Sequence, residues 1–81
     1  MAKLSAYGRK ELHRLKRKET EPDGETVMVV MSDRTVLQKF VRIHEDGRRE
    51  SSSWKKAGKV KPGHIDFFVE KAQEKLGYSL V

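Results

Sequence analysis

Residues 26–31 read TVMVVM, and this stretch decides the fold. It is short, rich in β-branched side chains and apolar on both alternating faces, which is typical of a central strand covered above and below. The preceding residues, EPDG at 21–24, favour a tight connection, because proline presets φ and glycine supplies a positive φ. We therefore predict that residues 26–31 form the most buried strand of a β-sheet.

The segments on either side of this stretch indicate neighbouring strands. SDRT at 32–35 turns the chain into residues 36–44, which alternate between two faces. One face carries Leu37, Val41 and Ile43, and the other carries Gln38, Phe40, Arg42 and His44. Residues 13–20 are ambiguous. Leu12 and Leu15 have helical spacing, whereas Leu15 among charged neighbours also suits an edge strand whose lysines deter edge-to-edge pairing. We favour the strand over a helical extension.

A fourth strand is predicted over residues 50–60. Asp46 and Gly47 form the dipeptide that favours a hairpin into this strand. Gly58 predicts a bulge or bend within it. The alternation places Ser52, Trp54 and Val60 on one face, and Ser53, Lys55 and Lys59 on the other.

Two helices complete the predicted fold. The first is short, over residues 5–12, with Ser5 as its N-cap. The second is amphipathic, because the apolar residues recur with helical spacing at Ile65, Phe68, Val69, Ala72 and Leu76. Gly77 is placed to end this helix in a left-handed conformation, and Leu80 in the apolar tail 78–81 is expected to pack back.

The order of these elements predicts an α+β domain. It consists of a short N-terminal helix, a four-stranded antiparallel β-meander and a C-terminal amphipathic helix packed on one sheet face. A chain of 81 residues buries too little surface for two cores, so residues 1–81 are expected to form a single domain.

The composition excludes several classes of protein. The chain has no cysteine, so disulfides and Cys-based zinc fingers are excluded. Its first residues, MAKLSAYGRK, lack the apolar run of a signal peptide, and no stretch approaches the roughly 20 apolar residues of a membrane span. We therefore expect a cytoplasmic protein without membrane contact.

The net charge of +6 is concentrated in two basic blocks. Residues 1–18 carry seven basic side chains and one acidic side chain, and residues 48–64 carry six basic and one acidic. The segment between them is acidic. Clustered cations create a local potential that attracts polyanions, so these blocks are the candidate binding surface.

Three motifs resemble a group of small uncharacterised proteins of tailed phages and prophages. They are LSAYGRKEL at residues 4–12, the Met31-Ser32-Asp33 turn before Val36-Leu37, and Trp54-Lys55 followed by Gly58-Lys59-Val60-Lys61. This chain has Asp33-Arg34 where that group leads us to expect Asp-Gly. The resemblance implies a phage accessory role in the cytoplasm of a bacterial host. It implies no activity and no site.

No pattern in the sequence predicts catalysis, a cofactor or a metal site. The histidines His13, His44 and His64 lie in three different segments, and zinc needs three or four ligands in a fixed geometry. Residues 51–53 are serines without the Gly-x-Ser-x-Gly turn of a nucleophile. Asp66, Glu70 and Glu74 fall on the polar side of the predicted helix and read as a solvated face. We expect a protein that is not an enzyme.

The leading functional hypothesis is nucleic-acid binding. Neither basic block carries a known base-reading signature, so contacts are expected to be mainly with phosphate and tolerant of sequence, whether DNA or RNA. Phe40 among cations on the sheet face away from the C-terminal helix could stack a base, although Phe40 also suits the core, as does Trp54. The candidate residues are Arg9, Lys10, Arg14, Lys16, Arg17, Lys18, Phe40, Arg42, Arg48, Arg49, Lys55, Lys56, Lys59 and Lys61.

Two other hypotheses stay open. In the first, the protein docks on a host protein with an acidic surface, with the exposed aromatics Phe67 and Tyr78 as anchors. In the second, a homodimer forms through an open edge of the sheet.

Overall fold

Strand β2, Asp23–Met31, lies at the centre of the sheet in a computed structural model that describes residues 10–21 and 23–81. Residues 26–31 are all buried, as the sequence predicts. β2 pairs antiparallel with β1, Glu11–Thr20, on one side and with β3, Thr35–Ile43, on the other. Pairing with β1 and β3 therefore shields both backbone edges of the most apolar segment from solvent.

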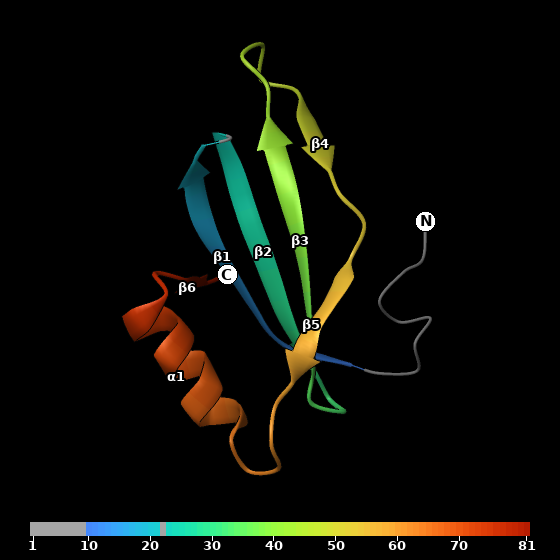
Figure 1. The fold of residues 1–81 in the computed structure, drawn as a ribbon, viewed down its shortest axis with the longest axis vertical. Helices are drawn as coiled ribbons and strands as arrows, with labels where there is room; N and C mark the ends of the chain where they lie inside the picture. The colour runs from blue at the N-terminus through green and yellow to red at the C-terminus, as the bar shows by residue number, and fades with distance from the viewer. Residues whose placement is uncertain (1–9, 22) are drawn as a thin grey trace.

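The remaining strands extend the sheet on both sides (Figure 1). β4, Arg49–Ser51, and β5, Lys55–Lys59, both pair with the free edge of β3, and β6, Ser79–Leu80, pairs with β1. With the helix α1, Ile65–Lys75, the described part of the chain forms an α+β domain built on one antiparallel sheet. Within residues 10–21 and 23–81 the sheet has six strands, so the prediction of four was wrong.

The predicted N-terminal helix over residues 5–12 is not compatible with the structure at its C-terminal end. Glu11 and Leu12 belong to β1, and residues 5–9 lie outside the described part. Leu12 is 48% exposed, whereas Leu15 is fully buried, so the two leucines do not form one helical stripe. The prediction of a strand over residues 13–20 is confirmed.

The predicted fourth strand is interrupted between β4 and β5. Ser52 takes the place of ladder pairing there: its N–H donates to the Phe40 carbonyl at 2.8 Å, and its Oγ accepts from the Phe40 N–H at 2.9 Å. The register also shifts between Val36, which faces Gly58, and Leu37, which faces Lys56. The bulge predicted at Gly58 is therefore present, and it reverses the side chains that follow it.

Helix α1 covers one face of the sheet. Val69 and Ala72 are buried, and Ile65 and Phe68 pack against the same cluster. The sheet and the segments flanking α1 contribute Leu15, Met28, Val30, Val36, Val60 and Tyr78 to it. Leu76, predicted to belong to the apolar stripe, is 52% exposed because the helix ends before it.

The tail after α1 turns at Gly77, whose φ of 75° confirms the predicted left-handed helix end. Tyr78 then enters the core at 6% exposure, which its expected role as an exposed anchor does not allow. Leu80 pairs with Leu15 in β6 and is 51% exposed, so the tail packs back through Tyr78 and not through Leu80.

Candidate nucleic-acid interface

The strand register decides which side chains share a face, because residues directly opposite each other in an antiparallel pair point to the same side. Leu15, opposite Met28, belongs to the cluster beneath α1. Arg14 and Lys16 flank Leu15 in β1, so they point to the opposite face. Following these pairs across the sheet separates a helix face, which packs on α1, from a second face that we call the basic face.

Seven cationic side chains share the basic face. One row runs from Arg14 through Val29 and Leu37 to Lys56, and the next runs from Lys16 through Val27 to Lys39. The alternation and register add Lys18, Arg49 and Lys59, so the complete set is Arg14, Lys16, Lys18, Lys39, Arg49, Lys56 and Lys59. Neighbouring strands lie about 4.8 Å apart, so the distance from β1 to β5 is roughly 14 Å. The fold thus brings cations of both basic blocks onto one surface.

Two carboxylates of the basic face are already paired with its arginines. Arg14 donates to Glu11 at 2.8 and 3.1 Å, and Arg49 approaches Glu25 at 3.4 Å. No ion pair among the described residues involves the five lysines of this face. Lys16, Lys18, Lys56 and Lys59 are exposed, and Lys39 is half-buried. Asp23, opposite Thr20 at the end of β2, is the third carboxylate of this face. Seven cations against three carboxylates leave the basic face with a net positive charge.

The cations surround an apolar floor. Val27, Val29, Leu37 and Val41 are all less than a tenth exposed, although α1 packs on the other side of the sheet. Trp54, in the segment between β4 and β5, packs on the cluster of Val29, Met31 and Leu37. Lysine and arginine can lay their methylene stems over such apolar positions while the charge stays in water. The basic face thus combines an apolar floor with cations around it.

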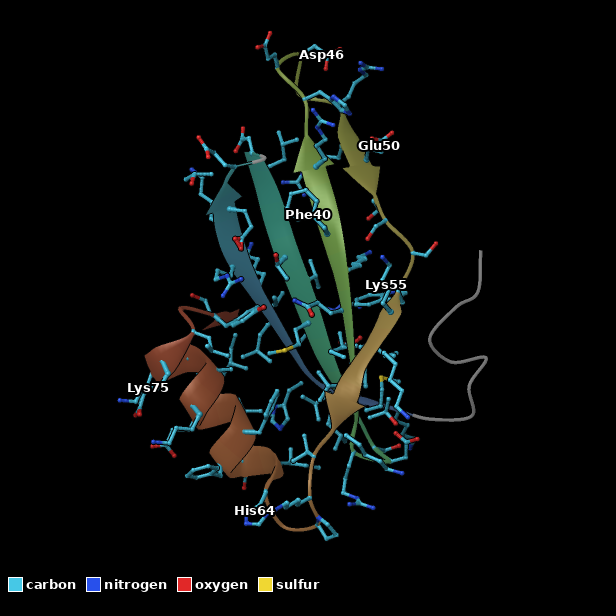
Figure 2. The ribbon with its side chains drawn as sticks, viewed as in Figure 1. Phe40, Asp46, Glu50, Lys55, His64 and Lys75 are labelled. Carbon is cyan, nitrogen blue, oxygen red and sulfur yellow. The ribbon has the colours of Figure 1, made fainter. Side chains whose placement is uncertain are left out.

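Several candidates lie on the helix face instead. Arg17 and Phe40 flank Thr26, and Lys55 is opposite Gln38, which donates to the Tyr78 hydroxyl at 3.3 Å. The expectation that Gln38, Phe40 and Arg42 share a face away from the C-terminal helix was therefore wrong. Phe40 lies over the upper half of the sheet, beyond the end covered by α1 (Figure 2). Its ring packs against Gly24 and cannot join the cations of the basic face.

Arg17 has a structural role within the helix face. Its guanidinium donates to the Leu76 carbonyl at 3.0 Å and to Glu19 at 2.9 Å. The same group lies 4.8 Å from the centroid of the Tyr78 ring. These contacts hold the end of α1 against β1, so Arg17 is not available for a phosphate.

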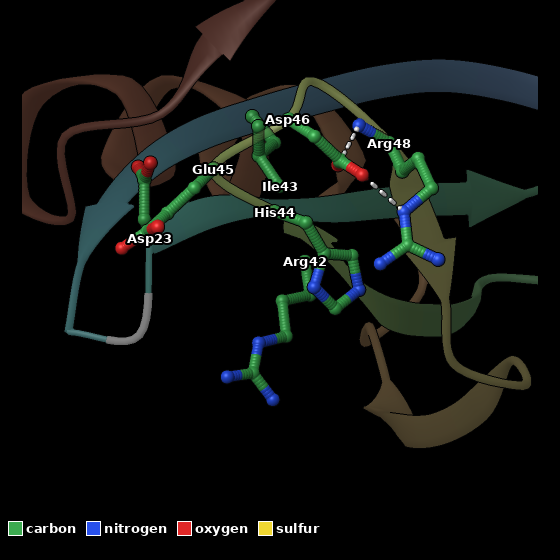
Figure 3. Close-up of a pocket in the computed structure, with 7 residues that line it drawn as sticks. All are labelled: Asp23, Arg42, Ile43, His44, Glu45, Asp46 and Arg48. Carbon is green, nitrogen blue, oxygen red and sulfur yellow. Dashed lines mark hydrogen bonds and ion pairs between the residues drawn. The ribbon is translucent and has the colours of Figure 1, made fainter.

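Arg42 and Arg48 line a hollow at the tip of the β3–β4 hairpin (Figure 3). Asp23, Glu45 and Asp46 line the same hollow. Arg48 is paired with Asp46 at 2.7 Å, and Gly47 makes the hairpin turn at a φ of 89°, as Asp-Gly predicts. The carboxylates offset the arginines here, so this hollow is a poor site for a polyanion.

The remaining candidates lie at the ends of the sheet. The N–H of Lys10 donates to Ser32 Oγ at 3.0 Å, just before β1 begins. Lys61 is exposed in the connection between β5 and α1. Arg9 falls outside the described residues.

Sequence reasoning missed two residues of the basic face, Lys39 and Trp54. Lys39 interrupts the alternating apolar set Leu37, Val41 and Ile43. A lysine at such a position signals that the face borders solvent. Trp54 was assigned to the core, and it is indeed packed on one side, but it remains partly exposed beside Lys39 and Arg14.

Three further features bear on the protein-docking, metal-site and membrane hypotheses. Phe67 is 57% exposed and lies beside His64 and Lys71, so it remains available as an anchor. Residues 10–21 and 23–81 contain no group of three or more potential metal ligands. Nor does that part of the chain contain a helix long and apolar enough to cross a membrane.

Comparisons with protein-family models, curated proteins and solved structures found no match to this chain. The geometry of the basic face is therefore the main basis for a functional proposal.

Proposed function

We propose that this protein is a non-catalytic domain that holds the phosphate backbone of a nucleic acid on its basic face, with little sequence preference. The observation that carries the proposal is the charge imbalance of that face: seven cations against three carboxylates, two of which are already paired with arginines of the face. Lysines that neutralise phosphates release condensed counterions, which drives binding. Phosphate contacts carry no direct sequence information, so tolerance of sequence is expected.

The setting that we propose for this binding is an accessory role of a tailed phage or prophage, in the cytoplasm of its bacterial host. This setting follows from the sequence resemblance alone. Phosphate binding by the basic face requires neither catalysis nor a cofactor, and we propose neither.

The test is a fluorescence-anisotropy titration of labelled single- and double-stranded oligonucleotides over a range of salt concentrations. Affinity should fall linearly on a log–log plot against salt. In the variant K16Q/K18Q/K56Q the slope for a single strand should decrease by about 2, because each phosphate contact contributes roughly 0.7. Glutamine keeps much of the side-chain length while it removes the charge.

The matched control is K55Q/K71Q/K75Q, which loses the same charge at exposed lysines away from the basic face. It should bind almost as the wild type does. Equal weakening in both variants would mean that net charge alone attracts the nucleic acid. Absence of binding at low salt would contradict the proposal and favour the alternative, a host protein with an acidic surface docked on the same cations.

A further inference from the structure

Trp54, the single tryptophan of the chain, lies at the edge of the basic face. It follows β4 and precedes β5, and its ring packs on Val29, Met31 and Leu37. The side chain is nevertheless partly exposed. Packing on the sheet already holds the ring beside the cations of the basic face. A ligand that stacks on the ring would therefore cost little further conformational entropy of the Trp54 side chain.

Two cations of the basic face contact this ring. The Lys39 ammonium lies 4.7 Å from the ring centroid, and the Arg14 guanidinium carbon lies 5.9 Å from it. Arg14 is also held by its two hydrogen bonds to Glu11. Lys39 has no ion-pair partner among the described residues, so its flexible stem can carry the ammonium away from the ring.

Replacement of the Lys39 ammonium by a base on the Trp54 ring is therefore favourable. A cation–π contact contributes about 0.5–1 kcal/mol where it is exposed and about 2 kcal/mol where it is desolvated, and a base stacked on an aromatic ring contributes about 1–3 kcal/mol. Lys39 and Trp54 are both half-buried, so the gain comes from the stacked base together with the new phosphate contact of Lys39. The ammonium that leaves the ring gains a phosphate. Bases within a duplex are already stacked, so only a single strand can present a free base to Trp54.

We propose that Trp54 stacks on a base of single-stranded nucleic acid while Lys16, Lys39 and Lys56 hold adjacent phosphates. This inference rests on the proposed function of the basic face. The residue proposed to stack on a base is thus Trp54 and not Phe40, which lies on the helix face. It also names the ligand class: a single strand, which the basic face should prefer to a duplex.

The experiment compares three ligands of equal length: an oligothymidylate, a strand of the same length whose residues are abasic, and a duplex. Wild-type Trp54 fluorescence should be quenched by the oligothymidylate and much less by the abasic strand. W54L should weaken binding of the oligothymidylate by about tenfold or more. Its affinity for the abasic strand and for the duplex should stay within about twofold of wild type. W54F, which keeps an aromatic face, should recover much of the loss.

The matched control is F67L. Phe67 is also an exposed aromatic with a lysine over its ring, Lys71 at 5.3 Å, but it lies on α1. F67L should bind all three ligands as the wild type does. The stacking proposal is wrong if the oligothymidylate and the abasic strand bind with equal affinity, quench Trp54 fluorescence equally and bind W54L as tightly as the wild type. Phosphate binding by the basic face would still stand.

The fluorescence comparison uses the wild-type chain, so it decides the question even where W54L folds poorly. Failure of all three ligands to bind at low salt would instead contradict the proposed function itself. An oligouridylate titrated in parallel separates RNA from DNA, and tighter binding of either single strand than of duplex supports the proposal.

Discussion

At the scale of single residues, Gly24 has the least space for a side chain among the glycines of the described residues. A Cβ on Gly24 would lie 2.7 Å from Cζ of the Phe40 ring and closer still to the Val41 carbonyl oxygen. Because the second neighbour is backbone of the paired strand, the clash cannot be relieved by a rotamer change. We expect Gly24→Ala to lower the free energy of unfolding by about 2 kcal/mol, measured by urea denaturation.

The comparison for this prediction is Gly47→Ala in the β3–β4 turn. There an added Cβ meets nothing within 4 Å, and the cost comes only from the φ of 89°, about 1 kcal/mol. Neither residue carries charge, so oligonucleotide affinity should be unchanged in both variants. A Gly24→Ala protein as stable as the wild type would show that the β2–β3 pair separates easily at this point.

Phe40 illustrates what residue-level reasoning could establish. The alternation correctly groups Phe40 with Gln38 and Arg42, because side chains of a strand point alternately to its two faces. It does not say which face α1 covers, since apolar residues occur on both: Val36 on one and Leu37 on the other. The expected aromatic site was placed on the wrong face for this reason.

At the scale of elements, two consecutive residues of β1 are expected to have separate roles. Arg17 faces α1 and bonds to Leu76 and Glu19, whereas Lys18 points to the basic face. Arg17→Met should lower the free energy of unfolding by about 1–2 kcal/mol, since it removes charge-assisted hydrogen bonds and a cation–π contact. Lys18→Met should leave stability within about 0.5 kcal/mol of wild type, as surface substitutions usually do.

The two variants should differ in the opposite way in oligonucleotide affinity: Lys18→Met should bind more weakly than the wild type, and Arg17→Met should not. Both lose one positive charge, but only Lys18→Met loses a phosphate contact and part of the salt slope. Urea denaturation and anisotropy titration on the same two proteins provide the measurement. Weakened binding in Arg17→Met with normal stability would place the binding surface on the helix face.

Elements defined by local pattern were predicted more reliably than those defined by partners. The apolar period of α1 and the β-branched run of β2 are properties of each segment alone, and both were found. The break at Ser52 depends on its bonds to Phe40 in another strand, and β6 exists only because β1 offers an edge. Such pairings are not visible in one segment of sequence.

The basic face itself is a property of tertiary structure. Its cations come from residues 14–18, from Lys39 and from residues 49–59, and the sequence predicted most of them as candidates. Their convergence depends on register, including the bulge that puts Lys56 and Lys59 on the basic face. Alternation within one strand separates Arg17 from Lys16 and Lys18, but the register between strands decides which of these side chains share a face with the cations of β3 and β5.

At the scale of the whole molecule, the net charge of +6 and its concentration on one face predict that salt stabilises the fold. Folding brings the lysines of both basic blocks together, and their repulsion is weakened when salt shortens the Debye length. A gain of about 1 kcal/mol corresponds to a rise in Tm of roughly 4–8 °C for a domain of this size. Thermal unfolding at low and moderate NaCl measures the effect.

The two triple variants test whether this repulsion comes from the basic face. K16Q/K18Q/K56Q should have a higher Tm than the wild type at low salt and a smaller rise with NaCl. K55Q/K71Q/K75Q should keep the wild-type response, because its lysines are spread over other surfaces. A Tm that falls with salt would mean that ion pairs outweigh repulsion in the free protein. The basic face would then lack the uncompensated charge that phosphate binding requires, since a polyanion stabilises the folded chain by relieving the same repulsion that salt screens.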